Sequence, residues 1–352
     1  MVPTISNQFS FPNPVQLHAL SVSKFCEELL EVFDEMALGC DVYNRSEGLR
    51  SIRDGLISLI KRVINPLIGS IRAELIPLME ALETPNTSSP PLKAVPGSKS
   101  TIIYHQSITA LQIVMPPYAK VLTTCTTSSI SHAILASLLI SVLWKALVAL
   151  SHRVDLRPPS PLLPESSFKR VRGSTPAATP PVTPPPSRFA IKLPPSRPAS
   201  PPLAITYATP AQDCKALYDL LVELPRPIDG QAQEAVHEAF EGLRTLPDLL
   251  AAVKTGLHVS SKDLNRLTTD ISFLVALPVV LSMGGVGAPS LTTLLGISED
   301  EYRKGCLSGF SRAEECAEMI GRRVLEVINS NPVANKVVIQ WLENEMEEME
   351  EE

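Results

Sequence analysis

The stretch "NRSEGLRSIRDGLISLIKRVI", from Asn44 to Ile64, has the spacing of an amphipathic helix. Its apolar residues recur at steps of three and four, which places them on one helical face. They are Leu49, Ile52, Leu56, Leu59, Ile60 and Val63. Asn44 and Glu47 have the spacing of a capping box, which predicts the start of the helix. Asn65-Pro66 should bend or end it, because a residue before proline avoids the helical region.

The same periodicity recurs outward in both directions, and strand patterns are almost absent. The sequence therefore predicts an all-α fold of two helical-bundle modules joined by a long disordered Pro-rich linker. Its expected parts are a flexible N-terminus at 1–14, a helical bundle at 15–153, a disordered basic linker at 154–210, a second bundle at 211–342 and an acidic tail at 343–352.

Composition limits the class of protein. A chain of 352 residues with 44% hydrophobic content can build two ordinary domains. Its formal charge of −6 argues against a general nucleic-acid binder, which needs a basic face. The six cysteines include no C-x-x-C pair, and the start of the chain lacks a secretory signal. We therefore expect reduced thiols and a cytoplasmic protein.

The segment Ile130–Leu150 is the most apolar part of the chain and admits two interpretations. As a helix its 21 residues would rise about 31 Å, close to the thickness of a bilayer core. Lys145 opposes a membrane span, because a charge near the bilayer centre costs about 2.5–3.5 kcal/mol. Ser137, Ser141 and Lys145 form a polar stripe at four-residue spacing. We expect a buried central helix, with a membrane segment as the alternative.

The segment from Leu156 to Pro210 has a different composition. It holds 16 of the 33 prolines, and seven Lys or Arg against one acid. Such a chain is expected to be extended, solvated and partly polyproline II. The cluster Lys169-Arg170-Val171-Arg172 either serves nuclear import or keeps the segment soluble.

Six residues within this segment are candidate docking positions. Lys192, Pro195 and Pro198 fit the form basic-x-x-Pro-x-x-Pro, which polyproline-reading domains recognise. Phe189, Ile191 and Leu193 alternate, so in an extended chain they point to one side. The partner is therefore a protein, with a polyproline-reading domain as one candidate. Packing of this peptide on its own bundles is the alternative.

The segment also holds six Ser-Pro or Thr-Pro pairs, which are candidate phosphorylation sites. They are Ser160, Thr175, Thr179, Thr183, Ser200 and Thr209. Each phosphate adds about −1.5 to −2, so full modification would invert the charge of the segment. The tail of glutamates at 343–352 has the opposite charge, and we hypothesise a loose intramolecular latch between the two.

The two halves share a possible internal repeat. Glu47–Asp54 and Glu241–Asp248 have five identities in eight positions, and a Cys-x-x-Leu start precedes each, at Cys26 and Cys214. Fixed order at nearly fixed offset favours duplication of a helical module. Chance resemblance between amphipathic helices is the alternative.

Catalytic and metal-binding patterns are weak throughout. Glu234-Ala-Val-His237 is a single Glu-x-x-His, whereas helical di-iron sites use two. Cys306 and Cys316 lack histidine partners for a zinc site. We expect no cofactor and no metal. The sequence therefore favours a non-catalytic adaptor or scaffold, with a membrane-associated protein anchored through Ile130–Leu150 as the alternative and an enzyme without recognisable motifs as a third possibility.

Overall fold

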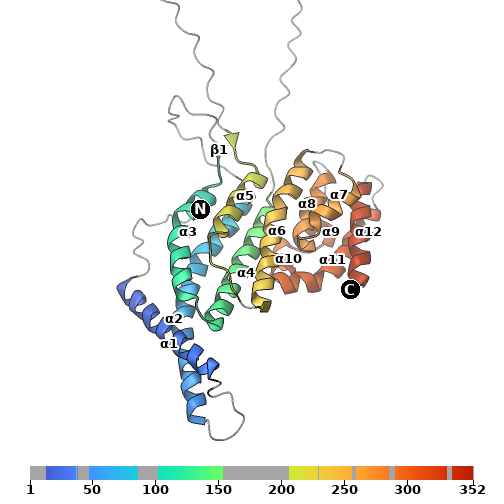
Figure 1. Cartoon of the computed structure of the whole chain (residues 1–352). Coiled ribbons are helices and arrows are strands. Elements are labelled where there is room, and N and C mark those ends of the chain that lie inside the picture. The colour runs from blue at the N-terminus through green and yellow to red at the C-terminus, as the bar shows by residue number, and fades with distance from the viewer. Residues whose placement is uncertain are drawn as a thin grey trace, which may run out of the picture.

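The computed structural model describes residues 13–36, 38, 47–85, 102–153, 206–228, 230–255, 259–284, 290–330 and 335–351 (Figure 1). Twelve α-helices account for most of these residues: α1 Pro14–Glu35, α2 Glu47–Glu80, α3 Gln106–Cys125, α4 Ser129–Ser151, α5 Pro210–Leu221, α6 Gly230–Thr255, α7 Ser261–Thr268, α8 Phe273–Leu281, α9 Leu291–Leu295, α10 Glu299–Cys306, α11 Phe310–Asn329 and α12 Lys336–Glu351. The structure also has two 3₁₀ turns, η1 Ala81–Glu83 and η2 Ser282–Gly284. Two strands of two residues each, β1 Ile102–Ile103 and β2 Thr206–Tyr207, pair in parallel. The all-α prediction is confirmed.

Helix α2 does not end at Asn65-Pro66 but continues to Glu80, with Pro66 and Pro77 inside it. A proline in a helix removes one backbone hydrogen bond and crowds the preceding turn. On both sides of Pro66, however, α2 buries apolar side chains, among them Ile64, Leu67 and Ile68. Tertiary packing thus outweighs the local preference and extends the helix.

Helix α4 is the centre of the fold and packs against α2, α6 and α8. Among the described helices it is the one long and apolar enough to cross a membrane, and 67% of its most apolar window is buried inside the protein. Its polar stripe faces α2: Ser137 Oγ accepts from Arg72 Nη2 at 3.0 Å, and Lys145 Nζ lies 3.1 Å from a Glu80 carboxylate oxygen.

The helices before and after the Pro-rich segment share one hydrophobic core. Helix α3 packs on α5, and α4 packs on α6 and α8. Trp144 of α4 donates its indole N–H to Leu307 O at 2.8 Å, and its ring lies 4.5 Å from that of Phe310. Arg303 of α10 binds both carboxylate oxygens of Glu83 at 2.6 and 2.9 Å. The two helical segments therefore stabilise each other.

The acidic residues near the C-terminus belong to the folded body, because α12 extends to Glu351. This helix packs on α7 and α11, and it buries Trp341 and Met346. The ring of Trp341 stacks on Phe273 at 5.6 Å, and Thr268 Oγ1 donates to Glu345 at 3.1 Å. The segment expected as an acidic tail is thus helical through residue 351.

The proposed repeat falls on two comparable helix pairs. Cys26 lies in α1, which packs on α2, and Cys214 lies in α5, which packs on α6. The repeated octapeptide opens α2 but lies in the middle of α6. A Cβ at Gly242 would meet Asp270 O at 3.0 Å, whereas one at Gly48 would meet nothing within 4 Å. The two copies therefore occupy different environments.

Candidate protein-binding site

The antiparallel hairpin of α1 and α2 extends away from the rest of the fold (Figure 1). Helix α1 packs on α2 and contacts α3 along a smaller part of its length. Asn13 caps α1 in a complete capping box with Gln16. Asp34, near the end of α1, accepts two hydrogen bonds from Arg53 of α2, at 2.6 and 3.1 Å. Local capping and this cross-helix ion pair hold the projecting part of the hairpin together.

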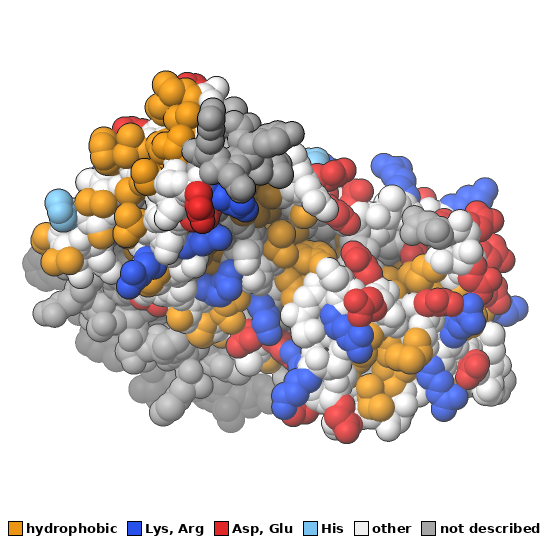
Figure 2. All heavy atoms as spheres, turned by 90° about the horizontal axis from the view of Figure 1, so that it is seen from below, with side chains coloured by type: hydrophobic (Ala, Val, Ile, Leu, Met, Phe, Trp, Pro, Cys, Tyr) orange, Lys and Arg blue, Asp and Glu red, His pale blue; other side chains and the backbone are white. Residues whose placement is uncertain are grey.

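The hairpin exposes an unusual amount of apolar surface. Nine of the fifteen exposed large hydrophobic side chains in the described part of the chain lie on it: Val15, Leu17, Val22, Phe25, Val32, Met36, Leu49, Ile52 and Leu59. Figure 2 shows hydrophobic side chains gathered over the hairpin, at the upper left of the view. Clustered apolar surface of this kind marks interaction sites in soluble folds, whereas single exposed apolar residues do not.

A buried carboxyl lies at the contact between α1 and the turn from α3 to α4. Thr127 donates its hydroxyl to Glu27 Oε2, while Glu27 Oε1 is buried without a hydrogen-bond partner. Burial raises the pKa of the Glu27 carboxyl, and the bonds from Thr127 and Ser128 oppose that rise. The neighbouring Cys125 thiol has its pKa raised to about 12 by burial and by the charge of Glu27. The docking of α1 therefore depends on an ionisable group.

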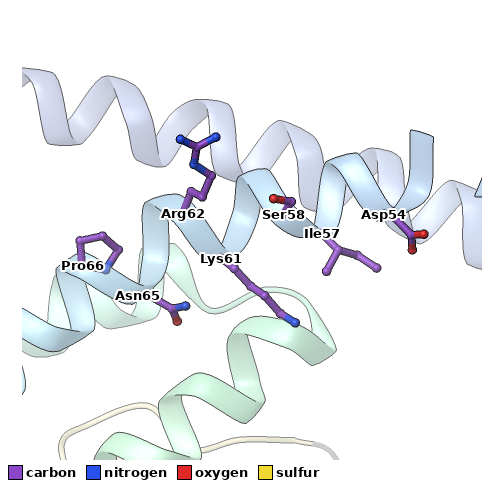
Figure 3. A pocket seen from close by; sticks show the side chains of 7 residues that line it. All are labelled: Asp54, Ile57, Ser58, Lys61, Arg62, Asn65 and Pro66. Atoms are coloured by element: carbon purple, nitrogen blue, oxygen red, sulfur yellow. The ribbon is translucent and has the colours of Figure 1, made fainter. Parts of the chain in front are cut away.

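A shallow hollow of about 580 Å³ lies along the outer side of α2 (Figure 3). Its lining consists of Asp54, Ile57, Ser58, Lys61, Arg62, Asn65 and Pro66. In Figure 3, Ile57, Lys61 and Asn65 extend to the same side of the helix. The hollow has two basic residues, one acid and apolar walls, which suits an amphipathic peptide or helix.

A second hollow of about 500 Å³ continues the first between α2 and α4. It shares Lys61 and Asn65 with the first and adds Arg72 of α2 and Ile134 of α4. Arg72 Nε is buried and has no hydrogen-bond partner, although its Nη2 donates to Ser137. The two hollows form one basic and apolar groove along α2.

The described residues that flank the Pro-rich segment lie together around a buried ion pair. Arg153, after α4, and Asp213, in α5, approach to 2.6 Å with side chains 4% and 0% exposed. Asp213 also accepts the backbone N–H of His105 at 3.0 Å. Burial, and then the charge of Arg153, lower the pKa of His105, whose Nδ1 accepts from Ser107 N at the start of α3. Polar groups from three helix ends are thus fixed at one point.

Strands β1 and β2 pair through their backbones close to the same ion pair. Ile102 and Ile103 of β1 pair in parallel with Thr206 and Tyr207 of β2, and Ala208 N donates to Ile103 O at 2.8 Å. Thr209 then caps α5 in a capping box with Gln212. Segment 154–205 thus starts and ends at one place on the fold.

Of the docking and phosphorylation candidates, the structure describes Thr209 alone. Phe189, Ile191, Leu193, Lys192, Pro195 and Pro198 lie outside the described residues, as do Ser160, Thr175, Thr179, Thr183 and Ser200. Thr209 is half-buried, and its hydroxyl accepts from Gln212 N at 3.2 Å. Its role as N-cap is local and structural.

The structure describes the candidate metal ligands and the candidate thiol pair. Glu234 and His237 are exposed on α6, and the described residues contain no group of three or more His, Cys, Asp or Glu that could hold a metal ion. Cys306 and Cys316, ten apart in sequence, lie in contact and are both buried. Burial and the neighbouring Cys316 raise the pKa of the Cys306 thiol to about 11. A raised pKa disfavours the reactive thiolate form of Cys306.

No protein-family model, curated protein or solved structure matches this chain. The sequence pattern places the apolar residues of 49–63 on one helical face without showing whether that face is covered, and it does not identify the exposed face of α1. A seven-residue spacing in α1, with Val15, Val22, Leu29 and Met36, was the available signal.

Proposed function

We propose that this protein is a non-catalytic adaptor that presents the Pro-rich segment 154–205 from a folded helical body. The supporting observation is the anchor formed by the Arg153–Asp213 ion pair and the β1–β2 strand pair at the two ends of that segment. The described residues at both ends of the segment therefore tether it to one face of the body. A partner held by the segment thereby gains a high effective concentration at nearby helical surfaces.

The recognition chemistry lies in residues 188–198 of the segment. A preformed polyproline helix loses little entropy on docking, and Lys192 would fix its direction against acids of an aromatic groove. The alternating Phe189, Ile191 and Leu193 would add an apolar edge to the same contact. The partner proposed is therefore a polyproline-reading protein domain.

Phosphorylation would regulate this contact by charge. The six Ser-Pro and Thr-Pro pairs surround the docking residues, and the segment from Leu156 to Pro210 carries seven basic residues and one acid. Phosphates at about −1.5 to −2 each would cancel and then reverse that positive charge. Binding to an acidic reader should weaken as modification increases.

Direct binding to a panel of purified SH3 domains tests the proposal. The full chain is titrated against each domain, beside a variant with Lys192→Ala, Pro195→Ala and Pro198→Ala. The control variant carries Arg172→Ala, Pro180→Ala and Pro181→Ala, which removes the same residue types outside the motif. We expect a binding domain whose affinity falls about tenfold or more in the motif variant alone. Equal binding by the two variants, or no binding by any domain, would refute this docking mode.

A further inference from the structure

The exposed face of α1 carries a regular heptad pattern. Val15, Val22, Leu29 and Met36 are spaced seven residues apart. Three residues after the first three of these positions lie His18, Phe25 and Val32. Phe25 is 59% exposed and Val15 77%, while Leu29 is half-buried. The opposite face of α1 buries Leu20, Cys26 and Leu30. Among the described residues, helix α1 thus has a packed face and a second, exposed seam of coiled-coil type.

The start of α2 carries a matching seam. Leu49, Leu56 and Val63 are seven apart, with Ile52 and Leu59 at the intervening positions. Leu49, Ile52 and Leu59 are exposed, whereas Leu56 and Val63 are half-buried. Gly48, Gly55 and Ser58 lie along one edge of this seam, and a Cβ at either glycine would meet nothing within 4 Å. The hairpin therefore presents two parallel apolar seams, with room for another helix beside α2.

The charges on the two helices have opposite sign. Between residues 14 and 35, α1 carries five acids and one lysine. Between residues 47 and 66, α2 carries four basic residues and two acids. The acidic face of α1 opposes binding to an anionic lipid surface. A second hairpin of the same kind instead offers a basic helix for α1 and an acidic helix for α2, so the surface is complementary to itself.

We propose that the α1–α2 hairpins of two copies of this chain pack face to face into an antiparallel four-helix bundle. A two-fold axis parallel to the hairpins places α1 of one copy against α2 of the other. Antiparallel helices in such a bundle pair residues at the same edge position of the heptad. Glu28, Glu35 and Arg62 each directly precede a seam residue and occupy that edge.

The register of the hairpin supports the pairing. A two-fold axis parallel to the hairpin does not change the position of a residue along that axis. The Asp34–Arg53 ion pair shows which residues of α1 and α2 lie at the same position along it. On this register Glu28 lies within about one helical turn of Arg62. Both side chains are exposed, so the two copies can form this ion pair at each of the two edges.

The face is large enough for a specific contact. Helix α1 has 22 residues, about 33 Å in length, and neighbouring helices lie about 10 Å apart. A two-helix face of that size is on the order of 600 Å², so a dimer would bury on the order of 1,200 Å² in total. That area is at the lower end for specific interfaces, which predicts a dissociation constant in the micromolar range.

Sedimentation equilibrium of the full chain measures this association, over concentrations up to the order of 100 μM. We expect a monomer–dimer equilibrium that Phe25→Glu weakens about tenfold or more. Met319→Glu, at an exposed position of α11, is the matched control and should leave it unchanged. Circular dichroism confirms that both variants are folded. A monomeric wild type, or equal association by wild type and Phe25→Glu, would overturn the proposal.

Charge reversal tests the arrangement of the two copies. One variant carries Glu28→Lys, and the other carries Arg62→Glu. Each alone should associate about tenfold or more weakly than wild type, because like charges then face each other at both edges. Mixed together they should form a heterodimer, in which both edges are complementary again. Failure of the mixture to associate better than either variant would refute the α1-to-α2 pairing. These tests leave the Pro-rich segment unchanged, so they are independent of the adaptor proposal.

Discussion

The carboxyl of Glu27 has a stability effect that depends on pH. It is buried between α1 and the turn that follows α3, and burial raises its pKa above the ordinary value of 4.5. The folded state therefore holds this proton more tightly than the unfolded state. The contribution of the group is complete below about pH 4.5 and is lost as the pH rises through the folded pKa. Ionisation of Glu27 places a charge in a buried position where its Oε1 lacks a hydrogen-bond partner.

Glu27→Gln should therefore stabilise the protein most at neutral pH. Glutamine keeps an oxygen that accepts from Thr127 and removes the titration. Urea unfolding of both proteins from pH 4 to pH 8 should show a difference in free energy that favours the variant increasingly as the pH rises. A difference that stays constant across this range would contradict the assignment. Glu31→Gln makes the same replacement on the exposed surface of the same helix and is the control.

At the level of elements, the start of α5 depends on one hydroxyl. Thr209 Oγ1 accepts from Gln212 N at 3.2 Å, and the Gln212 side chain accepts from Thr209 N at 2.9 Å. Thr209→Ala removes the first bond and should lower the free energy of unfolding by about 1 kcal/mol. Thr209→Ser keeps the hydroxyl and should change it little. Urea denaturation measures both, and equal loss in the two variants would show that packing rather than capping matters here.

The elements also show what local pattern can and cannot predict. Apolar periodicity and capping residues predicted the helices, because amphipathic spacing and caps are local properties. The pattern could not decide whether the helix bends or ends at Asn65-Pro66, because burial of Ile64, Leu67 and Ile68 depends on helices distant in sequence. For the same reason the pattern placed Leu49 and Ile52 on an apolar face but did not reveal that nothing in the described fold covers them. The candidate site could therefore be identified only from the tertiary structure, whereas the docking residues of 188–198 are identified from the sequence alone.

At the scale of the whole molecule, one hydrophobic core includes helices from both sides of the Pro-rich segment. Leu147 of α4 lies beside Gly242 of α6, where a Cβ would be 3.8 Å from its Cδ1. Trp144 of the same helix is bonded to Leu307 and packed on Phe310. Removing residues 206–352 would expose these two side chains, and burial of each large apolar side chain contributes about 1.5–3 kcal/mol. Neither half therefore buries a complete core by itself.

A chain cut between residues 180 and 181 should consequently reassemble. Co-expressed fragments 1–180 and 181–352, with an affinity tag on one, should purify together at equal amounts and unfold in one cooperative transition. Each fragment expressed alone should aggregate or lack a cooperative transition in circular dichroism. Arg303→Ala, which breaks the contact to Glu83 across the two fragments, should weaken the reassembled complex, whereas Lys304→Ala should not, because Lys304 pairs within its own helix. Two fragments that fold separately and do not associate would instead establish two independent bundles, each with its own core.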